Sequence, residues 1–122
     1  MGTKAKEHSG LKDHLARASE INISVTGRKS GRIISNPIWF VFEGDTLYLL
    51  PVRGSETQWY KNVLKNPSMQ VDARGEKLEV KATAVTDAAQ VASVVERFRG
   101  KYRGDVKKYY SKFDAAVVAK IG

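Results

Sequence analysis

The residues best suited to chemistry lie at positions 27–32, which read GRKSGR. Two glycines bracket two cations and a serine, and a third cation follows the second glycine. Glycine lets backbone N–H groups converge on one point, and such a concavity binds oxyanions. An arginine guanidinium forks onto a phosphate, while a lysine adds a point charge. The segment therefore suits an anion-binding turn, although taken alone a charged hairpin turn is the favoured interpretation.

A second polar constellation runs from Arg53 to Asn62. Residues 53–55 read RGS, and Ser55 with Gln58 matches the S-x-x-Q pattern of a capping box at the start of a helix. A helix N-terminus attracts anions, and Asn62 lies one turn beyond Trp59 on the same helix. The pattern suits a second anion contact. Taken alone, however, a core tryptophan beside an ordinary surface asparagine is the favoured interpretation.

The charge balance calls for an anionic partner. The 122 residues hold 21 lysines and arginines against 13 acids, a formal charge of +8. Nucleic acid, an anionic membrane surface and a phosphorylated cofactor all fit this excess. Residues 97–113 interleave cations with aromatics, as in proteins that stack single-stranded nucleic acid. We favour the simpler interpretation, a solvated basic face whose aromatic rings point inward.

Several kinds of site are excluded or not expected. The chain has no cysteine, which excludes disulfides, cysteine-ligated metals and a thiol nucleophile. The two histidines, His8 and His14, have no partner motif, so we predict no metal site. There is no apolar run near the ~20 residues of a membrane span and no apolar stretch of a secretory signal at the start, so we expect a cytoplasmic protein.

Strands dominate the elements that must position these residues. Alternating apolar residues and turn signals predict a flexible segment 1–9 before a single domain 10–122, with strands over 21–26, 33–43, 46–52, 69–73, 77–86 and 115–121. Helices are expected from Leu11, after the 55–58 cap as far as Asn66, from an Asp87 cap to Gly100, and within 101–113. Tight turns between strands favour antiparallel pairing, and closing the sheet into a barrel removes exposed edges.

Two aromatic residues stand side by side in the strand predicted for 33–43. Trp39 and Phe40 must point to opposite faces, because side chains alternate along a strand. One of them faces the interior. The other either packs against neighbouring side chains as well, or lines a pocket or a dimer interface. Pro37 cannot donate a ladder bond, which places it at a sheet edge or a bulge.

These segments together resemble a known family. VTGRKSGR at 25–32, NPIWF at 36–40, LYLL at 47–50, RGS and QWYKN within 53–62, and NP at 66–67 are similar to the split β-barrel flavin and deazaflavin oxidoreductases, the relatives of pyridoxamine 5′-phosphate oxidase. The pattern is most similar to the deazaflavin-dependent nitroreductase and quinone reductase branch. The resemblance implies a mostly β protein with flanking helices, built as a six-stranded antiparallel split β-barrel, and a homodimer.

The resemblance also implies a function. It points to hydride transfer from reduced coenzyme F-420, a deazaflavin, to an electron-poor quinone, enone or nitro compound, with FMN as the alternative cofactor. A non-enzymatic cofactor carrier and a basic nucleic-acid-binding module remain as alternatives from other classes. The cofactor-binding residues that it implies are Arg28, Lys29, Ser30, Gly31, Arg32, Asn36, Pro37, Trp39, Arg53, Gly54, Trp59 and Asn62.

Two further expectations follow from this hypothesis. A proton must accompany the hydride, and the candidates to donate or position it are Tyr102, Tyr109 and Tyr110. If Arg28 and Lys29 serve only the cofactor, replacing both with alanine weakens cofactor binding and leaves stability nearly unchanged.

Overall fold

The fold consists of two antiparallel sheets with helices around them. The computed structural model describes the backbone of residues 3–121 and the side chains from residue 10 to residue 121. The first sheet has the order β2-β1-β5-β6 and the second β3-β4-β8-β7. The strands are β1 (Ile21–Thr26), β2 (Ile33–Ile38), β3 (Phe40–Glu43), β4 (Thr46–Leu49), β5 (Ser68–Ala73), β6 (Glu76–Lys81), β7 (Thr83–Val85) and β8 (Ala116–Lys120).

Two of the predicted strands are each divided between the sheets. The segment predicted as one strand over 33–43 breaks at Trp39 into β2 and β3, and the segment 77–86 breaks at Ala82 into β6 and β7. At the second break the Ala82 N–H donates to the Pro67 carbonyl, 2.8 Å away, instead of to a strand partner. Strands that switch sheets at a bend are a common way to form corners. The predicted six-stranded barrel is therefore wrong in detail. The described residues form two four-stranded sheets that do not close into one ring.

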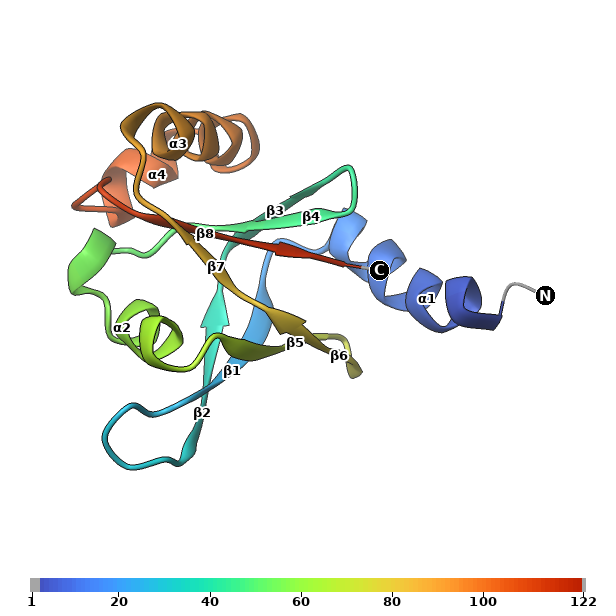
Figure 1. The fold of residues 1–122 in the computed structure, drawn as a ribbon. Coiled ribbons are helices and arrows are strands. Elements are labelled where there is room, and N and C mark those ends of the chain that lie inside the picture. Colours follow the sequence, from blue (N-terminus) through green and yellow to red (C-terminus); the bar gives the residue numbers. More distant parts are fainter. Residues whose placement is uncertain (1–2, 122) are drawn as a thin grey trace.

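Alternation along the strands supplies two hydrophobic cores. Phe40 enters the core between the sheets, and its neighbour Val41 enters a second core beneath α3 (Ala88–Tyr102) and α4 (Gly104–Tyr109). Leu49 and Leu50 divide in the same way. Burial of each such side chain contributes about 1.5–3 kcal/mol. The second sheet is consequently packed on both faces, and Figure 1 shows α3 and α4 lying over it.

The helices differ from expectation mainly at their ends. Asp87 caps α3 as predicted, accepting from the Gln90 N–H at 3.0 Å, but the helix continues through Gly100 to Tyr102. Helix α1 spans Thr3–Arg17, so it begins before the predicted Leu11. Residues 1 and 2 of the predicted flexible segment 1–9 lie outside the described residues. Between residues 3 and 121 no helix is long and apolar enough to cross a membrane.

Candidate functional site

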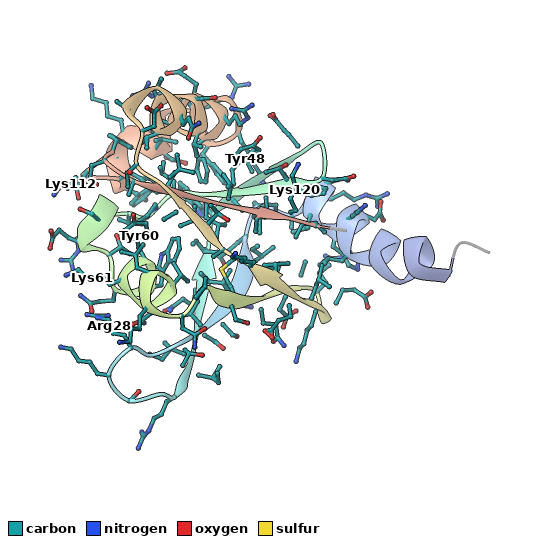
Figure 2. The ribbon with its side chains drawn as sticks, in the orientation of Figure 1. Arg28, Tyr48, Tyr60, Lys61, Lys112 and Lys120 are labelled. Atoms are coloured by element: carbon teal, nitrogen blue, oxygen red, sulfur yellow. The ribbon has the colours of Figure 1, made fainter. Side chains whose placement is uncertain are left out.

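The loop at residues 27–32 is tied to α2 (Gln58–Lys65) by one arginine. Both the Arg28 backbone N–H and its guanidinium donate to Asn62 Oδ1, at 3.1 and 2.8 Å. The same guanidinium donates to Gln58 Oε1 at 2.9 Å. Asn62 is only 5% exposed, and Arg28 satisfies its carbonyl oxygen. In Figure 2 the loop passes below α2, with Arg28 where the two meet. Arg28 thus fixes the loop to the helix, so replacing it should lower stability, contrary to the expectation that stability stays nearly unchanged.

The other loop residues point outward. Lys29, Ser30, Gly31 and Arg32 are all exposed. Gly31 adopts a φ of +73°, and the Ser30 hydroxyl accepts from the Arg32 backbone N–H at 3.1 Å. The turn therefore exists as predicted, with glycine in a left-handed conformation. Its free cations are Lys29 and Arg32, while Arg28 is engaged with α2.

The second constellation is organised by a residue far along the chain. Ser55 lies in the short 3-10 helix η1 (Gly54–Glu56) and donates from its backbone N–H and its hydroxyl to Asp114, at 2.8 and 2.6 Å. These bonds hold the pKa of the Asp114 carboxyl below its usual value. The predicted capping box is wrong. Thr57 occupies the N-cap position of α2 without a side-chain cap bond, and its hydroxyl accepts from the Arg53 N–H at 2.8 Å.

Asp114 and its neighbours bring cations from two segments together. The Ser111 N–H donates to the Val52 carbonyl at 2.9 Å, and Arg53 pairs with Lys112 in a parallel bridge. A hollow of about 430 Å³ results, here called the basic groove, lined by Arg53, Glu56, Gln58, Lys61, Ser111 and Lys112. Two of its three cations are ion-paired at 3.6 Å, Lys61 with Glu56 and Lys112 with Asp114. Figure 2 shows Lys112, Lys61 and Arg28 following one another down the left side of the molecule, with Lys61 and Arg28 beside α2.

A second hollow adjoins this groove and has a different chemistry. It measures about 470 Å³, within the range of small-molecule sites. We call it the aromatic cleft; its lining residues are Glu20, Asn36, Pro37, Ile38, Trp39, Val52, Thr57, Trp59, Asp105, Tyr109 and Tyr110. Consecutive residues link the two hollows at Val52 and Arg53, at Thr57 and Gln58, and at Tyr110 and Ser111. They therefore form one continuous surface with a basic half and an aromatic half.

The break between β2 and β3 presents Trp39 to the cleft, and Tyr102 supports it from behind. The two rings stack with centroids 4.4 Å apart and planes 5° from parallel. The Tyr102 hydroxyl lies 3.0 Å from the Phe40 N–H and 2.8 Å from the Phe40 and Ser19 carbonyls. Burial raises the pKa of Tyr102 to about 12. Tyr102 therefore positions Trp39 and does not line the cleft.

The two other tyrosines do line the cleft, and they differ in exposure. Tyr109 is 53% exposed and meets Trp39 edge-on, with centroids 5.7 Å apart. Tyr110 is buried, and burial raises the pKa of its hydroxyl, which makes it a weaker acid than a free phenol. Of the three predicted proton donors, Tyr109 is the one in contact with both the cleft and solvent.

A larger and shallower hollow of about 910 Å³ lies between α1, β3 and α3 and contains none of the predicted residues. Its cations already have partners. Arg97 pairs with Glu43 at 3.0 Å, and Lys101 donates to the Ala18 and Phe40 carbonyls at 3.0 and 2.9 Å. No group of three or more potential metal ligands comes together within the described part of the chain.

The structure thus distributes the predicted residues over three adjacent places. The cleft holds Asn36, Pro37, Trp39 and Trp59; Arg53 lines the basic groove next to Gly54; Arg28 and Asn62 bond to each other beside Gln58. Lys29, Ser30, Gly31 and Arg32 line neither hollow. Sequence reasoning missed Glu20, Lys61, Asp105 and Lys112. Lys61 directly precedes the predicted Asn62 on α2, whereas the other three become neighbours of the site only through contacts between distant segments.

Comparison with known proteins identifies the family. Residues 12–120 match the model described as an uncharacterized protein conserved in bacteria, DUF2255. The chain belongs to the DUF2255 family. No activity is attached to that description, so the function of this DUF2255 protein must be argued from the site.

Solved structures define the fold of this DUF2255 protein. It is similar to an F420-H2 dependent reductase (FDR-A), with a TM-score of 0.66 and 18% identity over 84% of this chain and 94% of that one. It is also similar to a putative pyridoxamine 5′-phosphate oxidase from Listeria innocua, with a TM-score of 0.67 and 14% identity over 93% of this chain and 91% of that one. An FAD-binding protein from Mesorhizobium loti matches with a TM-score of 0.67 and 10% identity over 93% of this chain and 88% of that one. The fold is therefore that of the split-barrel proteins related to pyridoxamine 5′-phosphate oxidase.

Proposed function

We propose that this protein is an oxidoreductase that binds a redox cofactor with an anionic tail, with coenzyme F-420 as the first candidate and FMN as the alternative. The observation that carries the proposal is the continuity of the basic groove with the aromatic cleft. A flavin-type cofactor has this polarity, with a flat ring system at one end and phosphate at the other. Similar structures named for F-420 or FAD support the same class.

The residues present fit such a cofactor. Arg53 and Lys112 would hold the anionic tail. No salt bridge within the described residues occupies Arg53, and Lys112 is paired only with the exposed Asp114, at 3.6 Å. Lys29 and Arg32 are exposed on the neighbouring loop and add to the local positive potential. Bound there, the cofactor supplies two-electron hydride chemistry, which protein side chains do not provide.

The residues of this chain would bind the cofactor, orient it against the acceptor and keep water out of the cleft. Trp39, held by Tyr102, forms a rigid wall of the cleft, and Trp59 forms another part of the lining. A rigid wall holds donor and acceptor in one orientation, and such positioning accounts for several kcal/mol of barrier in well-oriented reactions, on the order of 7–11 at most. Tyr109 is placed to donate a proton to a quinone, enone or nitro acceptor.

Titration tests the proposal directly. The purified chain is titrated with F-420 and, separately, FMN, and binding is followed by cofactor fluorescence. We expect saturable binding of one of them. Arg53→Ala with Lys112→Ala should weaken it at least tenfold, since a hydrogen bond to a charged group is worth about 1.5–3 kcal/mol.

The matched control removes two lysines outside the groove. Lys77→Ala with Lys81→Ala takes the same charge from exposed positions of β6. If neither cofactor binds, or if both double variants weaken binding equally, the proposal fails. An enzyme is then distinguished from a carrier by oxidation of the reduced cofactor when a quinone is added.

The nucleic-acid alternative has less support from the geometry. Phe98 and Tyr110 are buried, which removes two rings of the basic aromatic run from any stacking surface. Arg97 and Arg99 are ion-paired with Glu43 and Glu96. The same titration format with a single-stranded oligonucleotide tests it, because nucleic-acid binding would show a steep dependence on salt.

A homodimer is proposed on the edge of the first sheet. β2 is the edge strand there, and its Ile33 and Ile34 are 69% and 40% exposed. A second copy would cover these side chains and the free backbone groups of the edge. Sedimentation of the wild type and of Ile33→Lys tests this: the substitution should shift a dimer toward monomer.

A further inference from the structure

The aromatic cleft combines two features that point to the charge of its ligand. Four aromatic side chains line it: Trp39, Trp59, Tyr109 and Tyr110. Aromatic faces attract organic cations, because the ring quadrupole presents negative potential above its plane. The cleft is also large enough for a molecule of a few fused rings.

The charges in the lining reinforce this preference. Glu20 and Asp105 line the cleft and are exposed at its rim, and no lysine or arginine is among the described lining residues. That is contrary to the composition, since cations outnumber acids by 21 to 13. Neither carboxylate forms a salt bridge with another residue that the structure describes. The cleft is thus an acidic and aromatic hollow in a basic protein.

Three cations close to the cleft do not change the acidic character of its lining. Lys108 places its ammonium 5.3 Å from the centroid of Tyr109, and Arg53 and Lys112 belong to the adjoining groove. Lys112 is paired there with Asp114 at 3.6 Å, and Lys108 is exposed to solvent, so Glu20 and Asp105 remain the charged residues of the lining itself.

We propose that the aromatic cleft selects a planar organic cation, such as a nitrogen heteroaromatic carrying a fixed positive charge, through its rings and through Glu20 and Asp105. The inference rests on the proposed function only in naming this ligand as the acceptor substrate, which would share the cleft with the ring end of the reduced cofactor. Such a cation would take up one hydride, become a neutral dihydro compound and need no proton. The binding preference itself belongs to the chain and needs no cofactor.

The test uses three two-ring probes of similar shape: 1-methylquinolinium as the cation, quinoline as the neutral molecule and 1-naphthoate as the anion, at neutral pH and low salt. The chain has two tryptophans, Trp39 and Trp59, and both line the cleft. The two indole N–H signals of the isotope-labelled chain therefore report binding at this place. We expect both to shift and to saturate with 1-methylquinolinium.

The expected preference is about tenfold for the cation over quinoline, since an exposed cation–π or ion-pair contact changes affinity roughly two- to fivefold. Glu20→Gln with Asp105→Asn should reduce this ratio to about twofold while the affinity for quinoline stays the same. Glu79→Gln removes a carboxylate from an exposed position of β6 outside the cleft and should leave the ratio unchanged. Added salt should lower the ratio in the wild type.

Three results would overturn the inference: equal affinity for cation and neutral probe in the wild type, stronger binding of 1-naphthoate, or a ratio that the double variant leaves intact. The cofactor titration decides the proposed function separately. If the chain prefers 1-methylquinolinium but binds neither F-420 nor FMN, the cation site is supported and the oxidoreductase function is rejected. If it binds F-420 or FMN but does not prefer 1-methylquinolinium, the cofactor proposal stands and the cationic acceptor is rejected.

Discussion

Gly54 is the position where one added methyl group should disturb the site most. It adopts a φ of +55°, and a Cβ atom built there would lie 2.0 Å from Asp114 Oδ1. Gly54→Ala therefore carries two costs. The left-handed conformation costs a non-glycine residue about 1–2 kcal/mol. The clash also forces the Asp114 carboxylate away from Ser55, from which it accepts two hydrogen bonds.

The second cost can be bounded from the exposure of Asp114. Its side chain is 41% exposed, so each bond from Ser55 is worth about 1 kcal/mol, below the range for buried charged groups. The remaining contacts of the new methyl group, 3.0 and 3.1 Å from Lys112 Cγ and its carbonyl oxygen, require shifts of only a few tenths of an ångström. Gly54→Ala should then lower the free energy of unfolding by about 3–4 kcal/mol and Tm by about 10 °C.

The chain contains a matched control for this substitution. Gly31 also has a positive φ, +73°, but a Cβ atom there would meet nothing within 4 Å. Gly31→Ala should cost only the conformational part, about 1–2 kcal/mol. In the Asp114→Ala background the clash is gone, so Gly54→Ala should cost about as much as Gly31→Ala. Urea denaturation of the four variants and the wild type measures both differences.

Two results would refute this reasoning. One is an equal loss of stability for Gly54→Ala and Gly31→Ala in the wild-type background. The other is an undiminished cost of Gly54→Ala when Asp114 is already alanine. Either would mean that the segments around Ser55 and Asp114 are not held by the contact, and the basic groove would lose its structural support.

Three further predictions concern the contacts around the site. Arg28→Lys keeps the charge and the backbone bond to Asn62 but loses the guanidinium bonds to Asn62 and Gln58, so it should lower the free energy of unfolding by about 1 kcal/mol in urea denaturation. The depressed pKa of Asp114 stabilises the fold at pH values above its unfolded value of 3.8 and ceases to do so as the pH falls, so the stability difference between wild type and Asp114→Asn should shrink below about pH 4. Tyr102→Phe should cost about 1–2 kcal/mol at neutral pH. Because the pKa of Tyr102 rises from 10.0 to about 12 on folding, the wild type should lose this advantage as the pH increases from 10 to 12, as alkaline denaturation of both proteins would show.

Local pattern was sufficient for most of the strands. The alternation in 21–26 and the short β-branched stretch at the end of the chain both form strands, because a half-buried pleated surface needs that spacing. The cap at Asp87 was predictable for the same reason, since donor and acceptor are three residues apart. In each case the partners of the interaction are close in sequence, or they follow from a period of two.

The errors at Ser55 and Trp39 involve partners that are distant in sequence. Ser55 was expected to cap the nearby helix, but Asp114, 59 residues later, takes both of its donors. Trp39 was placed inside one long strand, yet the chain bends there. At that bend the Tyr102 hydroxyl bonds to Phe40 on both its N–H and its carbonyl. The residues near Ser55 and Trp39 in the sequence do not reveal that a distant residue will take over these bonds. The distant partner comes close only once the fold has formed, and the fold is what is being predicted.

The net charge of the chain also does not show where in the fold the charged residues gather. A net charge of +8 favours an anionic partner, but it is a sum over the whole sequence and carries no position. The pairing of residues 111–114 with residues 52–55 gathers cations into the basic groove. Glu20 and Asp105, from opposite ends of the chain, meet at the aromatic cleft. Because one fold separates the two signs over a short distance, the same basic protein can hold an anionic tail in one hollow and favour a cation in the next.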